Sequence, residues 1–314
     1  MGRIQRAVFG ISELEATFER RGFRAGSDAA RERLERVGAT FVAGYNEALE
    51  EPRSEWLGAR LARFGSDRGF AFEGAAMAAA LLDALIPGGR WNALRERAPE
   101  HVYMLHVGAG WAAARVPWLR RRIERYIERF DPVLRWLVVD GFGFHEGYFK
   151  PRATTREQRV PDFASNAARR AFDEGLGRAM WFVECGDAGR IARTVDAFAA
   201  ERRPDLWAGI GLAASYAGIA SVETLNSLRA RAAVLGGELA QGAAFAAKAR
   251  QLAGINTDHT TIACEILCGC SSSAAAFLCD QTYGEMVASG TPDYQMWRRT
   301  LSRRFATFSY AAAR

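Results

Sequence analysis

Apolar residues recur along this chain at helical spacing. Alanine, leucine, arginine and glutamate dominate almost every segment, and alternation of β-branched residues with a period of two, which marks strands, is nearly absent. The pattern predicts an all-α fold. Two architectures stay open, a helical-repeat-like array that shares one core and an irregular helical bundle.

Capping residues suggest where some helices begin. Ser27 precedes an acidic first turn and predicts a helix from the next residue, and a second helix is expected after Asn226 or Ser227. Gly38 and Gly236 follow these two starts at the distance where a C-cap or a tight contact is expected.

Breaks in the pattern divide the chain. The clearest are at residues 87–89, Pro204 and Gly269. Residues 151–163 contain two prolines and several charges, and are predicted to link an N-terminal helical half, 1–150, to a C-terminal half, 164–314. We expect the two halves to form one fused globular unit, because 314 residues can bury a single large core.

Short patterns repeat within the chain. The tripeptide FEG at 72–74 recurs as DEG at 173–175, an offset of 101 residues. The same offset pairs Gly88 with Gly189, Leu105 with Leu206, Gly108 and Gly110 with Gly209 and Gly211, and Ala112 and Ala113 with Ala213 and Ala214. An offset of 198 pairs Arg31, Arg33, Gly38 and Gly44 with Arg229, Arg231, Gly236 and Gly242. An internal pseudo-duplication is predicted.

Glycine is unusually frequent, with 31 residues, many of them inside apolar runs. Small residues at i and i+4, such as Gly108 with Ala112, remove bulk from one helix face. A helical glycine costs about 1 kcal/mol relative to alanine, so these faces are expected to pack closely against a neighbouring helix.

Charge and cysteine content narrow the function classes. The 42 basic and 36 acidic residues are interspersed, so no nucleic acid is expected as a partner. Five irregularly spaced cysteines make a poor disulfide framework, and Glu13 comes too early for a signal peptide. We expect a cytoplasmic protein. The longest uncharged apolar stretch, residues 207–222, falls short of the ~18 residues that span a bilayer.

Common catalytic motifs are missing from the sequence. It contains no Walker loop, no GxGxxG after a strand, no GxSxG and no HExxH. Nucleotide-dependent enzymes and standard hydrolases are therefore disfavoured, and the sequence leaves the cofactor unknown.

Five segments carry a family resemblance. They are residues 68–85, 101–115, 140–149, 239–250 and 259–269, and the match spans about two-thirds of the chain. Together they resemble an uncharacterised bacterial domain-of-unknown-function family that recurs beside enediyne polyketide synthases. The resemblance implies a role near polyene or enediyne-type metabolism, alongside a membrane-embedded electron-transfer-like protein and a large secreted protein. It supplies no catalytic residue.

The sharpest candidate site is DGFGFHEGYF, which places Asp140, His145 and Glu146 among aromatic residues. An apolar setting raises a carboxyl pKa and lowers that of histidine, which suits acid–base work. Glu73 and Glu174 occupy matching positions of the predicted duplication. Two or more of these residues are hypothesised to line an apolar cavity for a long unsaturated chain. The alternative, a capping or bridging role for each acidic residue, is favoured.

Other histidine and cysteine residues are interpreted as structural. His106 stands among small residues and is expected to be a hydrogen-bonded core histidine. Cys264, Cys268, Cys270 and Cys279 lack the spacing of zinc or iron–sulfur sites, so buried small hydrophobes are favoured over redox chemistry or metal binding.

Two basic stretches have an apolar stripe. One is residues 118–130, and the other carries Trp297, Leu301, Phe305 and Phe308 beside Arg298, Arg299, Arg303 and Arg304. Core packing with a solvated arginine face is favoured. The alternative is contact with anionic lipids or an acidic protein.

The leading functional hypothesis is a subunit of a biosynthetic machinery. It would bind or transform a long polyene-like intermediate at the inner face of the membrane, together with a membrane oxidoreductase-like partner. The main alternative is a non-catalytic helical scaffold for that partner. An independent small-molecule enzyme is a third possibility that the sequence leaves open.

Overall fold

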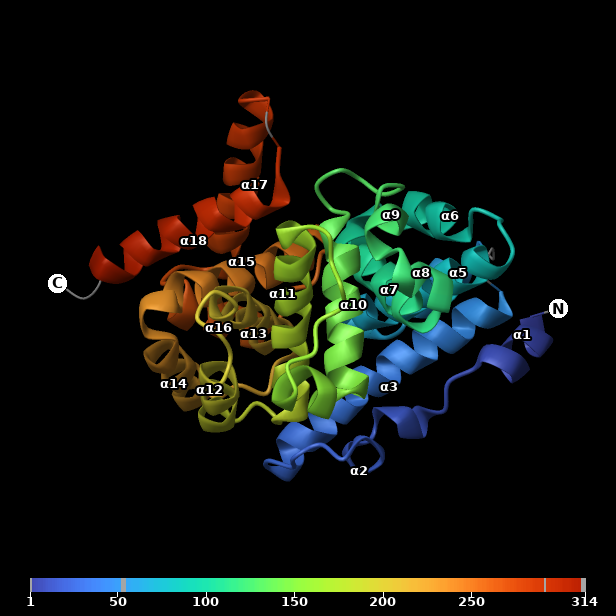
Figure 1. Cartoon of the computed structure of the whole chain (residues 1–314), viewed down its shortest axis with the longest axis horizontal. Coiled ribbons are helices and arrows are strands. Elements are labelled where there is room, and N and C mark those ends of the chain that lie inside the picture. The colour runs from blue at the N-terminus through green and yellow to red at the C-terminus, as the bar shows by residue number, and fades with distance from the viewer. Residues whose placement is uncertain (1, 52–54, 291, 312–314) are drawn as a thin grey trace.

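The computed structural model describes residues 2–51, 55–290 and 292–311. Helices account for all regular structure there, with no β-strand (Figure 1), which confirms the all-α prediction. The α-helices are α1 Gly2–Phe9, α2 Phe18–Arg21, α3 Asp28–Glu50, α4 Leu57–Ala62, α5 Arg68–Leu85, α6 Arg90–Arg97, α7 Val102–Arg115, α8 Pro117–Arg121, α9 Ile123–Ile127, α10 Trp136–Phe149, α11 Asn166–Val183, α12 Ala188–Asp196, α13 Arg203–Ala217, α14 Val222–Ala232, α15 Gly236–Leu252, α16 Asp258–Leu267, α17 Ser272–Ala288 and α18 Tyr294–Ala311.

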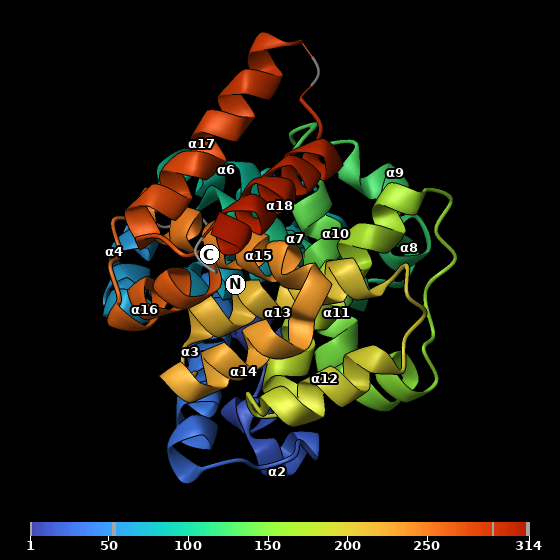
Figure 2. The same cartoon turned by 90° about the vertical axis from the view of Figure 1, so that its left-hand side faces the viewer.

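Seven long helices form a row in sequence order. These are α3, α5, α7, α10, α11, α13 and α15, and each packs against the next. The shorter helices α4, α6, α8, α9, α12 and α14 lie in the connections between them, and α17 and α18 pack on the α15 end of the row (Figures 1 and 2).

Pairs of small residues make the contacts within the row. At each contact, a Cβ added to the glycine of one helix would collide with a backbone carbonyl oxygen of the neighbouring helix. That carbonyl belongs to the residue three positions before the small residue with which the glycine is paired. The pairs are Gly44 with Gly74, Ala76 with Gly108, Gly110 with Gly141, Gly143 with Gly175, Gly177 with Gly209, and Gly211 with Gly242. The backbones therefore touch directly, as the glycine content predicts.

The paired glycines reveal the length of the repeat. Gly74, Gly108, Gly141, Gly175 and Gly209 follow one another at intervals of 33 or 34 residues. The offset of 101 seen in the sequence spans three such repeats, and the offset of 198 spans six. The chain is a series of single-helix repeats, each with a connecting segment, and the predicted duplication is a multiple of that shorter period.

The row curves until its early and late members meet. Arg250 on α15 donates a hydrogen bond to the carbonyl oxygen of Ser66, just before α5, at 2.6 Å. In the opposite direction, Arg68 on α5 donates to the carbonyl oxygen of Ala253, just after α15, also at 2.6 Å. The curved row therefore encloses an interior that side chains from most of its helices share.

The predicted helix starts have different outcomes. Ser27 caps α3 as predicted, because its hydroxyl accepts a hydrogen bond from the backbone of Ala30. The start after Asn226 or Ser227 is wrong, since both lie inside α14, which Ser221 caps. Gly236 begins α15 and is therefore not a C-cap.

The predicted linker connects two helices in direct contact. Residues 152–156 form a short π-helix, and the chain then runs without regular structure to α11. On either side of this segment, α10 and α11 meet through Gly143 and Gly175. One hydrophobic core extends from Phe18 to Phe305, across the halves 1–150 and 164–314.

The two basic stretches pack their apolar stripes inward. Residues 118–130 form α8 and α9 instead of one helix, with Ile123 and Ile127 buried. In α18, Arg298 is also buried, which corrects its assignment to a solvated arginine face. The side chain of Phe308 lies outside the described residues.

Candidate functional site

Three of the five candidate residues meet in the interior. Glu73, Asp140 and Glu174 each stand directly before a glycine of the row, on α5, α10 and α11. An equal position in the repeat gives their side chains an equal direction, and all three are at most 1% exposed. The structure thus brings together residues that are up to about a hundred positions apart in the sequence.

A buried arginine compensates two of these carboxylates. Arg178 on α11 donates a hydrogen bond to Asp140, and its Nη2 atom lies 3.9 Å from Oε2 of Glu73. The guanidinium also lies over the Phe144 ring, 4.6 Å from its centroid. A buried carboxylate needs such a partner, because desolvation of an unpaired charge is very costly.

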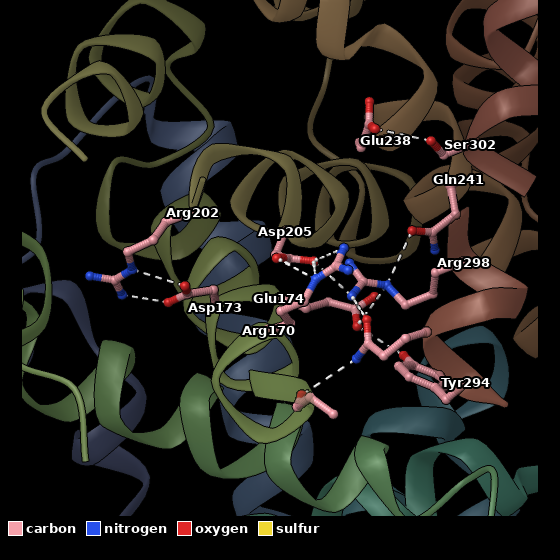
Figure 3. Close-up of polar contacts among 12 residues, drawn as sticks. Arg170, Asp173, Glu174, Arg202, Asp205, Glu238, Gln241, Tyr294, Arg298 and Ser302 are labelled. Carbon is pink, nitrogen blue, oxygen red and sulfur yellow. Dashed lines mark hydrogen bonds and ion pairs between the residues drawn. The ribbon is translucent and has the colours of Figure 1, made fainter. Parts of the chain in front are cut away.

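A second buried arginine holds the third carboxylate (Figure 3). Arg298 on α18 lies 3.3 Å from Glu174 and 2.9 Å from Asp205, and donates to the side-chain oxygen of Gln241 at 3.3 Å. The Tyr294 hydroxyl donates to Glu174 at 2.8 Å. This part of the cluster ties α18 to α11, α13 and α15.

Glu73 differs from its two counterparts in its hydrogen bonding. Neither of its carboxyl oxygens makes a hydrogen bond of normal geometry with a described residue, although the Trp111 indole N–H faces it closely enough to lower its pKa, whereas Asp140 and Glu174 each have one oxygen bonded. Burial raises the pKa of Glu73 to about 7, and the nearby charge of Arg178 offsets part of that effect. Glu73 is therefore a carboxyl group that can exchange a proton near neutral pH.

An apolar cavity lies in front of Glu73. Its volume is only about 40 Å³, so it is a narrow slot. Its wall includes Phe41, Met77, Trp111 and Phe182 from four helices of the row. The indole nitrogen of Trp111 is buried and makes no hydrogen bond of normal geometry with a described residue. We call this space the Glu73 cavity.

The mouth of the Glu73 cavity carries charge. Arg115 is exposed there, and Glu15 and Phe149 are partly exposed. The guanidinium groups of Arg115 and Arg21 lie 5.2 and 4.8 Å from the centroid of the Phe149 ring. An apolar slot thus leads from a cationic, aromatic entrance to a buried carboxyl group.

His145 and Glu146 lie apart from the interior carboxylates and do not line the cavity. Glu146 accepts two hydrogen bonds of 2.6 Å from Arg120, and it lies 3.2 Å from both Lys150 and Nδ1 of His145. Burial would raise the pKa of Glu146, but the bonds from Arg120 and His145 hold it well below its usual range. Burial lowers the pKa of His145 to about 4.

A second apolar cavity lies next to Arg178. Its volume is also about 40 Å³, and it is lined mainly by aromatic and aliphatic residues, including Tyr103, Tyr216, Phe245 and Trp297. No carboxylate lines it. For acid–base chemistry, the Glu73 cavity is the stronger candidate.

The two arginines that pair with the interior carboxylates, Arg178 and Arg298, were not predicted to lie in the interior. Arg178 had a visible signal, because it stands four residues after Glu174 within the otherwise apolar run LGRAMWF. Arg298 had none, since three other arginines within a few residues suggested a solvated face.

The remaining histidine and cysteine predictions concern packing. His106 is buried and its Nδ1 lies 2.7 Å from the carbonyl oxygen of Val102, which confirms a hydrogen-bonded core histidine. Cys264, Cys268 and Cys279 are buried, and burial raises the pKa of the last two. In the described part of the chain, no three His, Cys, Asp or Glu side chains are grouped as metal ligands.

Within the described residues, none of the helices alone is sufficiently long and apolar to cross a bilayer, while α16 and α17, bent by 68°, meet the length and hydropathy criteria together.

Comparison with known proteins gives one match. A family model described as "Protein of unknown function (DUF1702)" covers residues 1–305. No curated protein and no solved structure matches the chain.

Proposed function

Since the chain belongs to the DUF1702 family, whose description states no activity, we propose from its geometry that it binds a long unsaturated hydrocarbon chain in the Glu73 cavity and helps to transform it. The observation that carries the proposal is the position of Glu73, a buried carboxyl that makes no hydrogen bond of normal geometry and lies in the wall of an apolar slot. A structural carboxylate is normally hydrogen-bonded when buried.

The lining of the cavity suits such a ligand, but the slot is too small for a long chain in this conformation, so its walls must move apart when the chain binds. Aromatic walls from Phe41, Trp111 and Phe182 offer faces on which a flat conjugated chain can lie. The narrow width disfavours rounded ligands. Water has few polar partners on these walls, so the loss of water from the slot favours an apolar guest.

Glu73 has the properties of a proton carrier for the bound chain. With its pKa near 7, the group is present in both protonation states at neutral pH. It would take a proton from one carbon of the ligand, or return one to another, while Arg178 stabilises the carboxylate form. His145 and Glu146 are assigned to structure in this proposal, because ion pairs hold Glu146 in place.

The biological setting is proposed from the family resemblance. We place the protein in natural-product biosynthesis of the enediyne type, as the subunit that handles the polyene-like intermediate beside a membrane oxidoreductase-like partner. A scaffold without a site of its own is the alternative. The scaffold alternative is supported by α17, a helix that projects from the body of the molecule (Figure 1) and carries two exposed apolar side chains, Phe277 (63% exposed) and Val287 (51% exposed).

Two variants test the proposal. Glu73→Gln keeps the shape of the side chain and removes the acid, so a producing strain that carries it should lose most of the pathway product at a normal level of folded protein. Glu146→Gln, outside the cavity, is the matched control and should retain product. Full product from the Glu73→Gln strain would exclude a catalytic role for Glu73 and favour the scaffold.

Binding is tested separately. Val42 lines the cavity and is buried, so Val42→Phe should fill the slot. Titration with a fluorescent conjugated tetraene alcohol should show saturable binding to the wild type and at least tenfold weaker binding to Val42→Phe. Equal affinity of the two proteins would place the ligand elsewhere.

A further inference from the structure

The Glu73 cavity has a chemically distinct end at its mouth. Arg115 is exposed there and forms no ion pair within 4.0 Å with a described carboxylate, but partial burial lowers its pKa and the Glu15 carboxylate at the same mouth offsets part of that effect. In contrast to Arg115, Arg20 and Arg21 each form an ion pair with Glu15. The entrance thus holds the guanidinium groups of Arg115 and Arg21 and the Glu15 carboxylate, and Glu35 lies near the lining residue Tyr148.

Phe149 fixes where that positive charge lies. Both Arg115 and Arg21 pack over its ring, so the two cations converge on one partly exposed aromatic side chain at the rim. Cations that repel each other are held together in this way. Glu15 already pairs with Arg21, so an added anion would compensate mainly the charge of Arg115 and gain charge-assisted hydrogen bonds from it.

The opposite end of the cavity excludes an anion. Glu73 itself carries negative charge when ionised, and Asp140 lies in the same buried cluster. The walls between the two ends are almost entirely apolar. Polarity along the slot therefore runs from cationic at the rim to apolar and then acidic at the base.

Building on the proposed function, we infer that the ligand is a long-chain carboxylate, bound with its carboxylate at Arg115 and its unsaturated tail toward Glu73. The substrate class is therefore an amphiphile of the fatty-acid type whose carboxyl group is unmodified. The orientation also predicts which part of the molecule is transformed, namely carbons in the tail and not those beside the carboxylate.

Matched ligands and variants test the inference. The ligands are a fluorescent conjugated tetraenoic fatty acid and the alcohol with the same tail, and affinities are measured by titration at low ionic strength. We expect the wild type to bind the acid about tenfold more tightly than the alcohol. Arg115→Gln should remove this preference without changing the affinity for the alcohol, and Arg115→Lys should restore part of it.

Arg129→Gln is the control variant. Arg129 is also exposed and lies over an aromatic ring, that of Tyr126, but it does not line the cavity. It should leave both affinities unchanged, and thermal unfolding should show that all variants are folded. Equal wild-type affinity for acid and alcohol would overturn the carboxylate assignment and leave the proposed function intact. Binding of neither ligand would overturn both.

Discussion

Four acidic residues of this protein stand directly before a glycine, and their environments differ sharply. Glu73, Asp140 and Glu174 occupy one position of the helical repeat and point into the interior. Glu146, which precedes Gly147, is out of phase with the repeat and is surrounded by Arg120, Lys150 and His145. The position in the repeat, and not the dipeptide, decides whether a carboxyl joins the buried interior cluster or an ion-pair group nearer the surface.

The largest difference is expected when the cationic partners are removed. Arg178→Met leaves Glu73 and Asp140 buried without their cation, which should lower the free energy of unfolding by about 3–5 kcal/mol. Arg120→Met leaves Glu146 with Lys150 at a site where Arg120 is 34% exposed, so the loss should stay near 1 kcal/mol. Urea denaturation of both variants measures the contrast, and equal losses would contradict it.

The pH dependence of stability should separate the same two regions. Glu73 has a pKa of 4.5 when unfolded and about 7 when folded, so the folded state retains a proton that the unfolded state has released. As pH rises from 4.5 to 7, this difference lowers stability by up to about 3 kcal/mol. Glu73→Gln should therefore gain stability relative to the wild type between pH 5 and pH 8.

Glu146→Gln provides the opposite case. The folded pKa of Glu146 is depressed, so its stabilising effect is complete above the unfolded value of 4.5 and is lost as pH falls through the folded value. Removal of the Glu146 carboxylate should therefore lower the free energy of unfolding by the same amount at pH 5 and pH 8. Denaturation curves at the two pH values test both variants, and a pH-independent difference for Glu73→Gln would refute the raised pKa.

The smallest effect concerns the glycines of the repeat. Gly175→Ala places a Cβ against the backbone carbonyl of Asp140, so α10 and α11 must separate, at a cost of about 1–3 kcal/mol. Gly284 lies in the middle of α17 with nothing near its missing side chain. There, alanine should add about 0.5–1 kcal/mol through helix propensity. Differential scanning calorimetry compares the two; a stabilising Gly175→Ala would contradict the backbone contact.

The sequence was sufficient for the helical class and for close packing through glycine. It also singled out three of the interior carboxylates, since Glu73 and Glu174 matched at the offset of 101 and Asp140 lay in an apolar run, but not Asp205, which is equally buried and pairs with Arg298. The repeat of 33 or 34 residues is hard to recognise in the sequence, because single glycines recur among apolar residues that change from one repeat to the next. Only in space does each glycine meet its partner in the next helix.

What the sequence could not supply is the pairing between distant helices. Arg298 lies 124 residues after Glu174, and its neighbours Arg299 and Arg303 suggested a surface position. Likewise, His145 and Glu146 looked like the strongest pair because they are adjacent. Their separation from the cavity follows from helical geometry, since neighbouring residues on a helix point in different directions.

The closure of the row by Arg250 and Arg68 has a consequence for how the protein is made. These bonds join positions 184 and 185 residues apart, so they form only after most of the chain has left the ribosome. The residues that line the Glu73 cavity all lie between positions 11 and 182, so its walls can meet earlier, while local helix pairs assemble during synthesis. Joining the two ends of the row is therefore a late step, which waits for residues up to Ala253.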